Sequence, residues 1–216
     1  MRKIILFISL FVSFLFASCC KEINANPTEL SLFVGDQATI FTTNEKVTFN
    51  TSNPYHASVD EIGLVTANKV GQTNITIESK KETTNVPVTI EPRFTYFDEP
   101  FLVFGSSINE VVEHHGNYTM EINNWYIFNN YGPHSSILSF KFEDDVLTAV
   151  EVTIDLNDGG VDIEGFMLER YTPTNTKVEQ QTFTNDLSGL TPASIKLTIV
   201  PEVDAATIRY EPYNNK

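Results

Sequence analysis

Two neighbouring runs in the first half of the chain, Gly63-Leu64-Val65-Thr66-Ala67 and Gly71-Gln72-Thr73-Asn74-Ile75-Thr76-Ile77, determine its class of fold. Each run starts at a glycine and continues with apolar residues interleaved with polar ones, which is typical of a half-buried β-strand after a turn or bulge. Five further segments have the same character: residues 30–34, 38–41, 47–49, 57–59 and 85–90. Seven short strands in about 65 residues predict a small antiparallel β-sandwich. Because Pro87 has no amide hydrogen, we expect the last strand at an edge.

The same region resembles the bacterial immunoglobulin-like domain, group 2. Five segments carry the resemblance in the order of the family: Leu32-Phe33-Val34-Gly35-Asp36, Thr51-Ser52-Asn53-Pro54, Ala57-Ser58-Val59-Asp60, Gly63-Leu64-Val65-Thr66-Ala67 and Val70-Gly71-Gln72-Thr73-Asn74-Ile75-Thr76. One departure is Phe49, where many members carry Trp. The resemblance implies a spacer or adhesion module of an envelope protein, and it brings no catalytic residues.

The first residues of the chain predict export. Arg2 and Lys3 precede an almost wholly apolar run at residues 4–17, and the small residues Ala17 and Ser18 follow before Cys19. This is the layout of a cleavable secretory signal, and the run is shorter than the roughly 20 residues of a membrane-spanning helix. Its end resembles the lipobox of bacterial lipoproteins. The resemblance implies that Cys19, or alternatively Cys20, is lipidated and anchors the protein to a membrane, most simply the outer membrane of the envelope. The alternative is an ordinary cleaved signal without a lipid.

Composition narrows the classes of partner. Cys19 and Cys20 are the only cysteines, so neither folded part of the chain contains an internal disulfide. The formal net charge is −14, and loss of Arg2 and Lys3 with the signal makes it two units more negative. An acidic protein repels phosphate backbones, so we expect no nucleic-acid partner. Solubility is the simplest reason for the acidity.

After residue 92 the chain changes character and shows its first helical signal. Ser107-Ile108-Asn109-Glu110 has the form of a capping box, and an apolar stripe with helical spacing follows before Gly116. A helix is therefore expected from about residue 108. Three strand candidates come next, at residues 118–128, 136–143 and 147–155.

The last part of the chain repeats this pattern. Asp162 can cap a second helix, and its apolar positions lie 55 residues after those of the first. Gly165 weakens this helix, so a strand over residues 163–171 is the alternative. A helix followed by three strands, twice, predicts one antiparallel sheet with both helices on one face. The whole chain is thus expected to be mostly β, with an Ig-like β-sandwich before an α+β domain.

These patterns divide the chain into a lipoprotein signal at residues 1–18, a linker at 19–26, an Ig-like domain at 27–92 and an α+β domain at 93–216. The expected duplication covers residues 107–155 and 162–212. The order of elements, with Phe104-Gly105-Ser106 before the helix, is similar to that of the β-lactamase inhibitor protein and of small outer-membrane assembly lipoproteins. The segment Phe166-Met167-Leu168-Glu169-Arg170-Tyr171 is similar to segments of uncharacterised Bacteroidetes lipoproteins, which have no assigned activity.

No motif predicts catalysis or a cofactor. Residues 155–160 begin like a calcium-binding loop. The fifth position of that loop, which needs Asp or Asn, is Gly159, and the twelfth, which needs Glu, is Phe166. Glu143-Asp144-Asp145 is expected to be an exposed hairpin tip rather than a metal site. Nucleophile elbows, phosphate-binding loops and zinc-protease motifs are all missing from the sequence. We therefore expect a protein that is not an enzyme and holds neither metal nor cofactor.

The aromatic and amide residues around residues 124–134 suggest binding instead. Trp125, Tyr126, Tyr131 and His134 combine flat faces with polar groups, which suits sugar rings. The simpler alternative is that Trp125 and Tyr126 straddle a strand, one packed inside and one at the surface. Two functions follow. The first is a surface lipoprotein whose Ig-like spacer presents a domain that binds a glycan or a protein; the second is a periplasm-facing structural, assembly or inhibitor-like lipoprotein that binds a protein.

Overall fold

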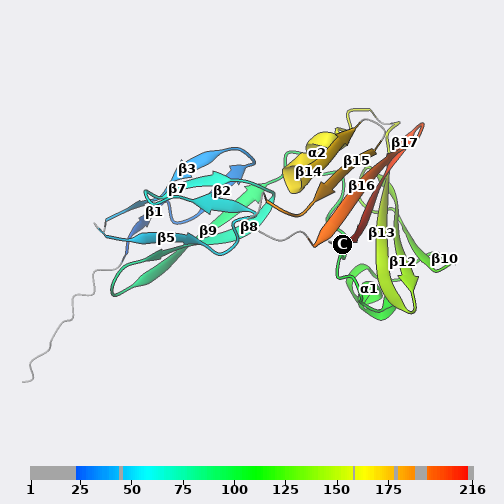
Figure 1. Cartoon of the computed structure of the whole chain (residues 1–216), viewed down its shortest axis with the longest axis horizontal. Helices are drawn as coiled ribbons and strands as arrows, with labels where there is room; N and C mark the ends of the chain where they lie inside the picture. Colours follow the sequence, from blue (N-terminus) through cyan, green and yellow to red (C-terminus); the bar gives the residue numbers. More distant parts are fainter. Residues whose placement is uncertain (1–22, 44–45, 158, 178–179, 188–193, 214–216) are drawn as a thin grey trace, which may run out of the picture.

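The computed structural model describes residues 23–43, 46–157, 159–177, 180–187 and 194–213. It is mostly β, with two helices among the described residues. Figure 1 shows two β-rich domains arranged end to end. The signal segment, Cys19 and Cys20 lie outside the described residues.

The N-terminal domain is a β-sandwich. One sheet has the strand order β2 (Leu30–Phe33), β9 (Thr83–Glu91), β8 (Gly71–Glu78) and β5 (Thr48–Thr51). The facing sheet has the order β3 (Gln37–Thr39), β7 (Leu64–Ala67) and β6 (Ala57–Val59), and a short ladder joins β1 (Ala25–Asn26) to β4 (Phe41–Thr42). The inward residues of the alternating strands form its core, including Ile40, Val65, Ile75, Ile77, Val86, Val88 and Ile90. This is the Ig-like sandwich expected from the strand pattern.

Pro87 does not place its strand at an edge. β9 lies between β8, with which it pairs antiparallel, and β2, with which it pairs parallel. The ladder with β2 begins at Val88, one residue after the proline. Pro87 therefore lies just before the doubly paired part of β9, where the missing amide hydrogen costs no ladder bond to β2.

The C-terminal domain is built on one eight-stranded antiparallel sheet. Its order is β10 (Met120–Ile122), β11 (Trp125–Asn129), β12 (Ser135–Glu143), β13 (Val146–Asp155), β17 (Ala205–Pro212), β16 (Ile195–Pro201), β15 (Gln180–Thr184) and β14 (Thr172–Lys177). The helices are α1 (Ile108–His115), which precedes β10, and α2 (Ile163–Arg170), which precedes β14. Each helix is thus followed by four strands, and the two sets join where β13 pairs with β17.

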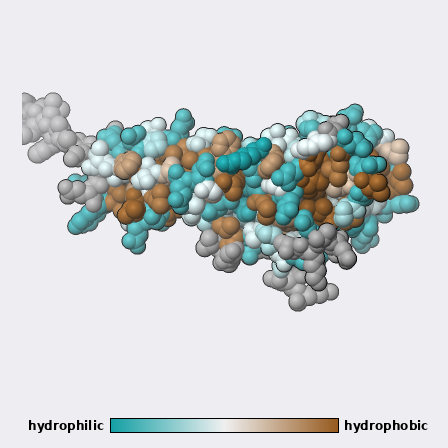
Figure 2. Space-filling model, turned by 90° about the horizontal axis from the view of Figure 1, so that it is seen from above, coloured by the Kyte–Doolittle hydropathy of each residue, from teal (hydrophilic) through white to brown (hydrophobic). Residues whose placement is uncertain are grey.

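Both helices pack on one face of this sheet. Val111 of α1 and Phe166 and Met167 of α2 are buried in one core with alternate residues of the central strands, including Leu138, Phe140, Val150, Val152, Leu197, Ile208 and Tyr210. The residues that alternate with these along the strands, such as Lys141 and Arg209, lie on the opposite side of the sheet. We call this side the helix-free face. Figure 2 shows that apolar side chains also reach the surface of both domains, in groups separated by hydrophilic ones.

Two details of this domain differ from the expectation, and a third decides between the two alternatives for residues 163–171. Among the described residues, four strands rather than the expected three follow each helix. The segment 118–128 is a hairpin rather than one strand, because Asn123 and Asn124 both adopt positive φ (50° and 65°) and turn the chain between β10 and β11. The segment 163–171 contains a helix rather than a strand. The Asp162 side chain accepts a 2.8 Å hydrogen bond from the Gly165 amide, and the Phe94 ring occupies the space that a Cβ at Gly165 would need.

Candidate functional site

Trp125 lies on the helix-free face, and the strand register defines its neighbours. It faces Ile122 of β10 on one side and Lys141 of β12 on the other. Lys141 in turn faces Ala149 of β13. The adjacent row across the sheet contains Met120, Ile127, Ser139, Glu151, Arg209 and Thr198. An aromatic residue therefore lies where an apolar edge of this face meets a charged centre.

The indole of Trp125 extends across the sheet rather than away from it. Its centroid is 6.0 Å from Lys141 Nζ and 5.9 Å from Arg209 Cζ. Arg209 belongs to β17, which is three strands away from β11 in the sheet, or about 14 Å at the usual strand spacing. Both side chains must therefore reach toward each other over β12 and β13. These distances are at the outer limit of cation–π contacts, so the two cations flank the ring.

The charges beside Trp125 are paired. Arg209 Nη1 is 3.1 Å from Glu151 Oε1, and Arg209 Nε is 2.9 Å from Glu211 Oε1. Lys141 Nζ is 2.9 Å from Glu143 Oε1. Burial raises the pKa of the Glu151 carboxyl, and the neighbouring guanidinium of Arg209 opposes that shift. Two carboxylates hold the planar guanidinium in one orientation.

A groove runs along this charged centre. Its volume is about 520 Å³, and its lining residues are Lys141, Glu143, Thr148, Ala149, Lys196, Arg209, Glu211 and Pro212. Lys196 of β16 is exposed and faces Glu211 of β17 in the ladder. Lys141 and Arg209 both line the groove and flank the indole, so Trp125 lies at its margin. The groove and the ring together form the candidate site.

The apolar edge of the face is exposed. The exposed fraction is 50% for Met120 and 48% for Ile122, and Ile137 is also exposed. Met120 pairs with Ile127, which lies on the same face two residues after Trp125. Contiguous exposed apolar residues of this kind are typical of a contact surface for another molecule.

Of the four residues that the sequence suggested for binding, Trp125 lies on the helix-free face and the other three contact residues of the core. Tyr126 follows Trp125 on the strand and lies on the opposite face, with its ring against Tyr118 and Phe142. The Tyr131 hydroxyl donates a 2.6 Å hydrogen bond to the Asp98 carbonyl. The His134 ring meets Tyr96 edge to face. Only Trp125 of the four contributes to the candidate site.

The residues that complete the site were not found from the sequence. Lys141, Lys196 and Arg209 come from three strands, and only the sheet order brings them together. The one available signal was alternation: each is a polar residue between two apolar ones on a strand of the core. That pattern predicts the helix-free face but not which strands are adjacent.

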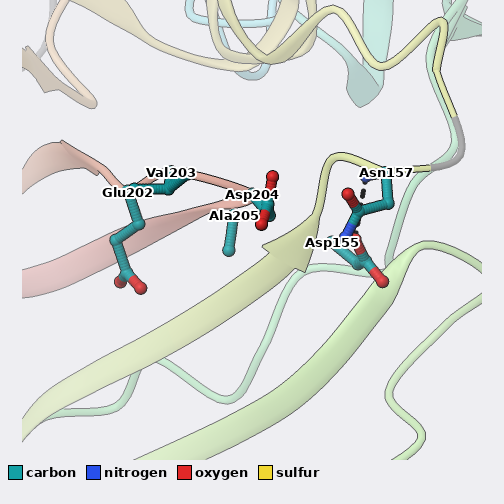
Figure 3. A pocket seen from close by; sticks show the side chains of 6 residues that line it. All are labelled: Asp155, Asn157, Glu202, Val203, Asp204 and Ala205. Atoms are coloured by element: carbon teal, nitrogen blue, oxygen red, sulfur yellow. Dashed lines mark hydrogen bonds between the residues drawn. The ribbon is translucent and has the colours of Figure 1, made fainter.

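A second hollow lies at the far end of β13 and β17. Figure 3 shows Asp155 and Asn157 on one side of it and Glu202 and Asp204 on the other. The Asn157 amide donates a 2.8 Å hydrogen bond to Asp155 Oδ1, which is ordinary turn geometry. Asp158, in the loop that resembled a calcium site, lies outside the described residues. In the part of the chain that the structure describes, no group of three or more His, Cys, Asp or Glu residues is placed to share a metal ion.

A junction between the domains fixes where the candidate site points. Four successive carbonyls at the end of α2 accept hydrogen bonds from the Ig-like domain. Lys69 Nζ donates to Leu168 O at 2.7 Å and to Tyr171 O at 2.8 Å, the Val70 amide donates to Glu169 O at 2.8 Å, and the Tyr55 hydroxyl donates to Arg170 O. The last turn of a helix leaves its carbonyls without partners inside the helix. The Ig-like domain therefore caps α2.

The segment between the domains strengthens this junction. The buried carboxylate of Glu169 accepts hydrogen bonds from the amides of Arg93 at 3.0 Å and Phe94 at 3.3 Å. Arg170 Nη2 donates to the Phe94 carbonyl at 3.0 Å, and its guanidinium lies 3.7 Å from the centroid of the Phe166 ring. Burial lowers the pKa of the Lys69 ammonium that caps the helix. The two domains are joined by fixed polar contacts and not only by a linker.

Residues 29–90 match the family Bacterial Ig-like domain (group 2). The N-terminal sandwich is therefore a bacterial Ig-like domain. The match indicates a non-catalytic binding or spacer module in an extracellular or envelope protein. No curated protein matches the chain. Neither helix among the described residues is long and apolar enough to cross a membrane.

Two solved structures are similar to the chain over different lengths. A bacterial Ig-like domain containing GH10 xylanase from termite gut is 20% identical with a TM-score of 0.27; the match covers 40% of this chain and 23% of the xylanase chain. Domains 5–6 of the S-layer protein SbsC are 15% identical with a TM-score of 0.28, over 91% of this chain and 85% of that one. At these TM-scores neither likeness extends to the arrangement of the whole chain.

Proposed function

We propose that the protein is a lipid-anchored, non-catalytic binding protein of the bacterial envelope. Its Ig-like domain is a rigid spacer, and its C-terminal domain carries the face that binds a glycan or a protein. The observation that supports this most directly is the capping of α2 by Lys69, Val70 and Tyr55. Domains joined by a linker alone reorient freely, whereas these hydrogen bonds set one angle between the spacer and the binding domain.

The proposed anchor lies close to the spacer. If Cys19 or Cys20 carries the lipid, only the residues up to position 22 separate it from Ile23, which packs in the core of the sandwich. Four extended residues, from Cys19 to Ile23, reach at most about 14 Å. The Ig-like domain would then stand near the membrane, and the C-terminal domain would be held beyond it by the length of the sandwich. A protein with this layout presents the helix-free face at a defined height and direction.

A test of the anchor and the orientation uses whole cells. We expect the Cys19→Ala chain to leave the membrane fraction, with Cys20→Ala as the matched control for the other candidate. Protease added to intact cells should digest the wild-type chain. If intact cells protect the chain while permeabilised cells do not, the surface position is wrong and the periplasm-facing function takes its place.

The second candidate function is a periplasm-facing lipoprotein that binds a protein partner. Exposed Met120 and Ile122 at the edge of the helix-free face favour it, because contiguous apolar residues with a polar rim are typical of protein interfaces. A photo-crosslinking amino acid at position 122 would test it in cells. A specific crosslinked partner that Met120→Lys abolishes would support this function, and the absence of any partner would contradict it.

A further inference from the structure

We propose that the groove beside Trp125 binds a neutral oligosaccharide, with one sugar ring stacked on the indole and the next in the groove. This inference rests on the proposed function and names a ligand class for it. Three observations support it: the indole lies across the sheet, a groove of about 520 Å³ adjoins it, and the charges around both are balanced.

The chemistry of the lining suits sugar hydroxyls. Of the eight lining residues, the ammonium groups of Lys141 and Lys196 and the guanidinium of Arg209 are donors, and the carboxylates of Glu143 and Glu211 are acceptors. A hydroxyl both donates and accepts, so neighbouring hydroxyls of one ring can bind a cation and a carboxylate together. A pocket for an apolar side chain of a protein would have an apolar lining.

The aromatic residue supplies the other half of sugar recognition. A pyranose ring presents C–H groups on its flat face, and the face of an indole carries partial negative charge that attracts them. Trp125 is partly exposed and is flanked by Lys141 and Arg209 at about 6 Å. A sugar stacked there would have its hydroxyls within reach of these two donors.

The balance of charge favours a neutral sugar over an acidic one. Lys141 is paired with Glu143, Arg209 is paired with both Glu151 and Glu211, and Lys196 faces Glu211 in the ladder. Three cations and three carboxylates leave no net positive charge for a uronate or a sulfate. The chain as a whole carries a net charge of −14, which also repels acidic glycans.

The groove is prepared before any ligand binds. Arg209 is fixed by two carboxylates, and Ala149 in the groove lining is buried and has no side chain beyond Cβ. Fixed donors and a free volume reduce the entropy that is lost on binding. The volume is within the range of about 300–1,000 Å³ that is usual for ligand sites.

Trp125 is the single tryptophan of the chain, so tryptophan fluorescence reports on this site alone. We would titrate the full chain with neutral gluco-, xylo- and manno-oligosaccharides and with oligogalacturonate, and follow both fluorescence and heat. At least one neutral sugar should change the emission. Trp125→Ala should weaken its binding, measured by heat, by about tenfold or more. Lys196→Met keeps the tryptophan and should weaken it by about threefold to tenfold.

Phe41→Ala is the matched control, because Phe41 is an exposed aromatic of the Ig-like domain, and it should leave binding unchanged. Circular dichroism would check that each variant is folded. Binding of oligogalacturonate alone would overturn the neutral class, and undiminished binding by folded Trp125→Ala would overturn the site. No binding of any sugar would overturn the inference and leave the proposed function with a protein ligand. The protease test on cells decides the surface position independently of these results.

Discussion

Lys69 of the Ig-like domain lies with its Nζ 2.7 Å from the carbonyl oxygen of Leu168 in α2 of the other domain. The same ammonium is 2.8 Å from Tyr171 O, so one side chain closes the helix from outside its own domain. A positive charge at a helix C-terminus also complements the helix dipole. α2 has only eight residues and contains Gly165, so it depends on such outside contacts.

Lys69→Met should therefore destabilise the whole protein and not only the end of α2. The methionine keeps the length of the side chain but loses both hydrogen bonds, and Lys69 is only 9% exposed, so water replaces them poorly. We expect a loss of about 2–4 kcal/mol in the free energy of unfolding, measured by urea denaturation. Calorimetry should show one transition for the wild type and two for the variant, because the domains no longer unfold together.

Lys80→Met is the control for this prediction. Lys80 is exposed on the Ig-like domain, so its substitution should change the free energy of unfolding by less than about 0.5 kcal/mol. Equal effects of the two substitutions would show that the junction does not couple the domains. Two separate transitions in the wild type would show the same.

Gly63 in the Ig-like domain should not accept a side chain. Its φ is +84°, and a Cβ there would lie 2.5 Å from the Ile40 carbonyl oxygen and 2.9 Å from the Phe49 ring. Gly35 has almost the same φ, +88°, but no atom within 4 Å of that position. Both substitutions to alanine cost about 1–2 kcal/mol for the backbone conformation, and Gly63→Ala adds about 1–3 kcal/mol for the clash.

Thermal denaturation of the two alanine variants would measure this difference. Gly63→Ala should melt clearly below Gly35→Ala, and both should melt below the wild type. Because the backbone cost is common to both, the difference reports only the close approach of Ile40 and Phe49. Equal melting temperatures would mean that the sandwich relaxes around the new methyl group.

Local signals in the sequence predicted local structure well. The Glu110 carboxylate accepts a 2.8 Å hydrogen bond from the Ser107 amide and a 2.9 Å bond from its hydroxyl, as the capping pattern indicates. These bonds lower the pKa of Glu110. At α2 the side chain of the N-cap residue is the acceptor: Asp162 Oδ1 accepts a 2.8 Å hydrogen bond from the Gly165 amide. Each of these contacts joins residues three apart, so chain spacing alone specifies them.

Contacts between distant strands could not be predicted in this way. Trp125 and Arg209 are neighbours only because β13 pairs with β17, and no local pattern encodes that pairing. The same holds for Lys69 and α2, which meet across the domain junction. Alternation indicated that Trp125 and Tyr126 take opposite faces, but proximity in the sequence did not predict that the rings of Tyr131 and His134 pack against Phe97 and Tyr96 of the core.

The turn at Asn123 and Asn124 offers a test of the β10–β11 hairpin. Both residues have positive φ, which asparagine tolerates and a β-branched residue does not. Asn124→Gly should leave stability unchanged or raise it slightly, and Asn124→Val should cost about 1–2 kcal/mol. Hydrogen exchange would show faster exchange of the Thr119 amide, which bonds to Ile127 O, in Asn124→Val only. Equal exchange in both variants would contradict the hairpin.

His115 should make the protein less stable in mild acid. Its Nε2 accepts a 3.1 Å hydrogen bond from the Phe101 amide, and its ring packs against Phe128 and Phe140, so the folded protein requires the neutral imidazole. Burial, together with the charge of His114, lowers the pKa of His115 from 6.5 to about 4. The unfolded chain therefore binds a proton below pH 6.5 that the folded chain accepts only near pH 4.

The free energy of unfolding should consequently fall as the pH drops from about 6.5 to about 4, by up to about 3 kcal/mol from this residue. Above that range of pH, His115 should make no pH-dependent contribution to stability. His115→Gln retains an acceptor oxygen but binds no proton, so the variant should lose less stability over the same interval. His114→Gln removes only the smaller of the two causes, the neighbouring charge, so it should reduce the loss of stability in acid much less than His115→Gln does. Because carboxylates titrate in both proteins, the quantity to measure is the difference between the denaturation curves of wild type and His115→Gln. Parallel curves would show that His115 is not held neutral by the fold.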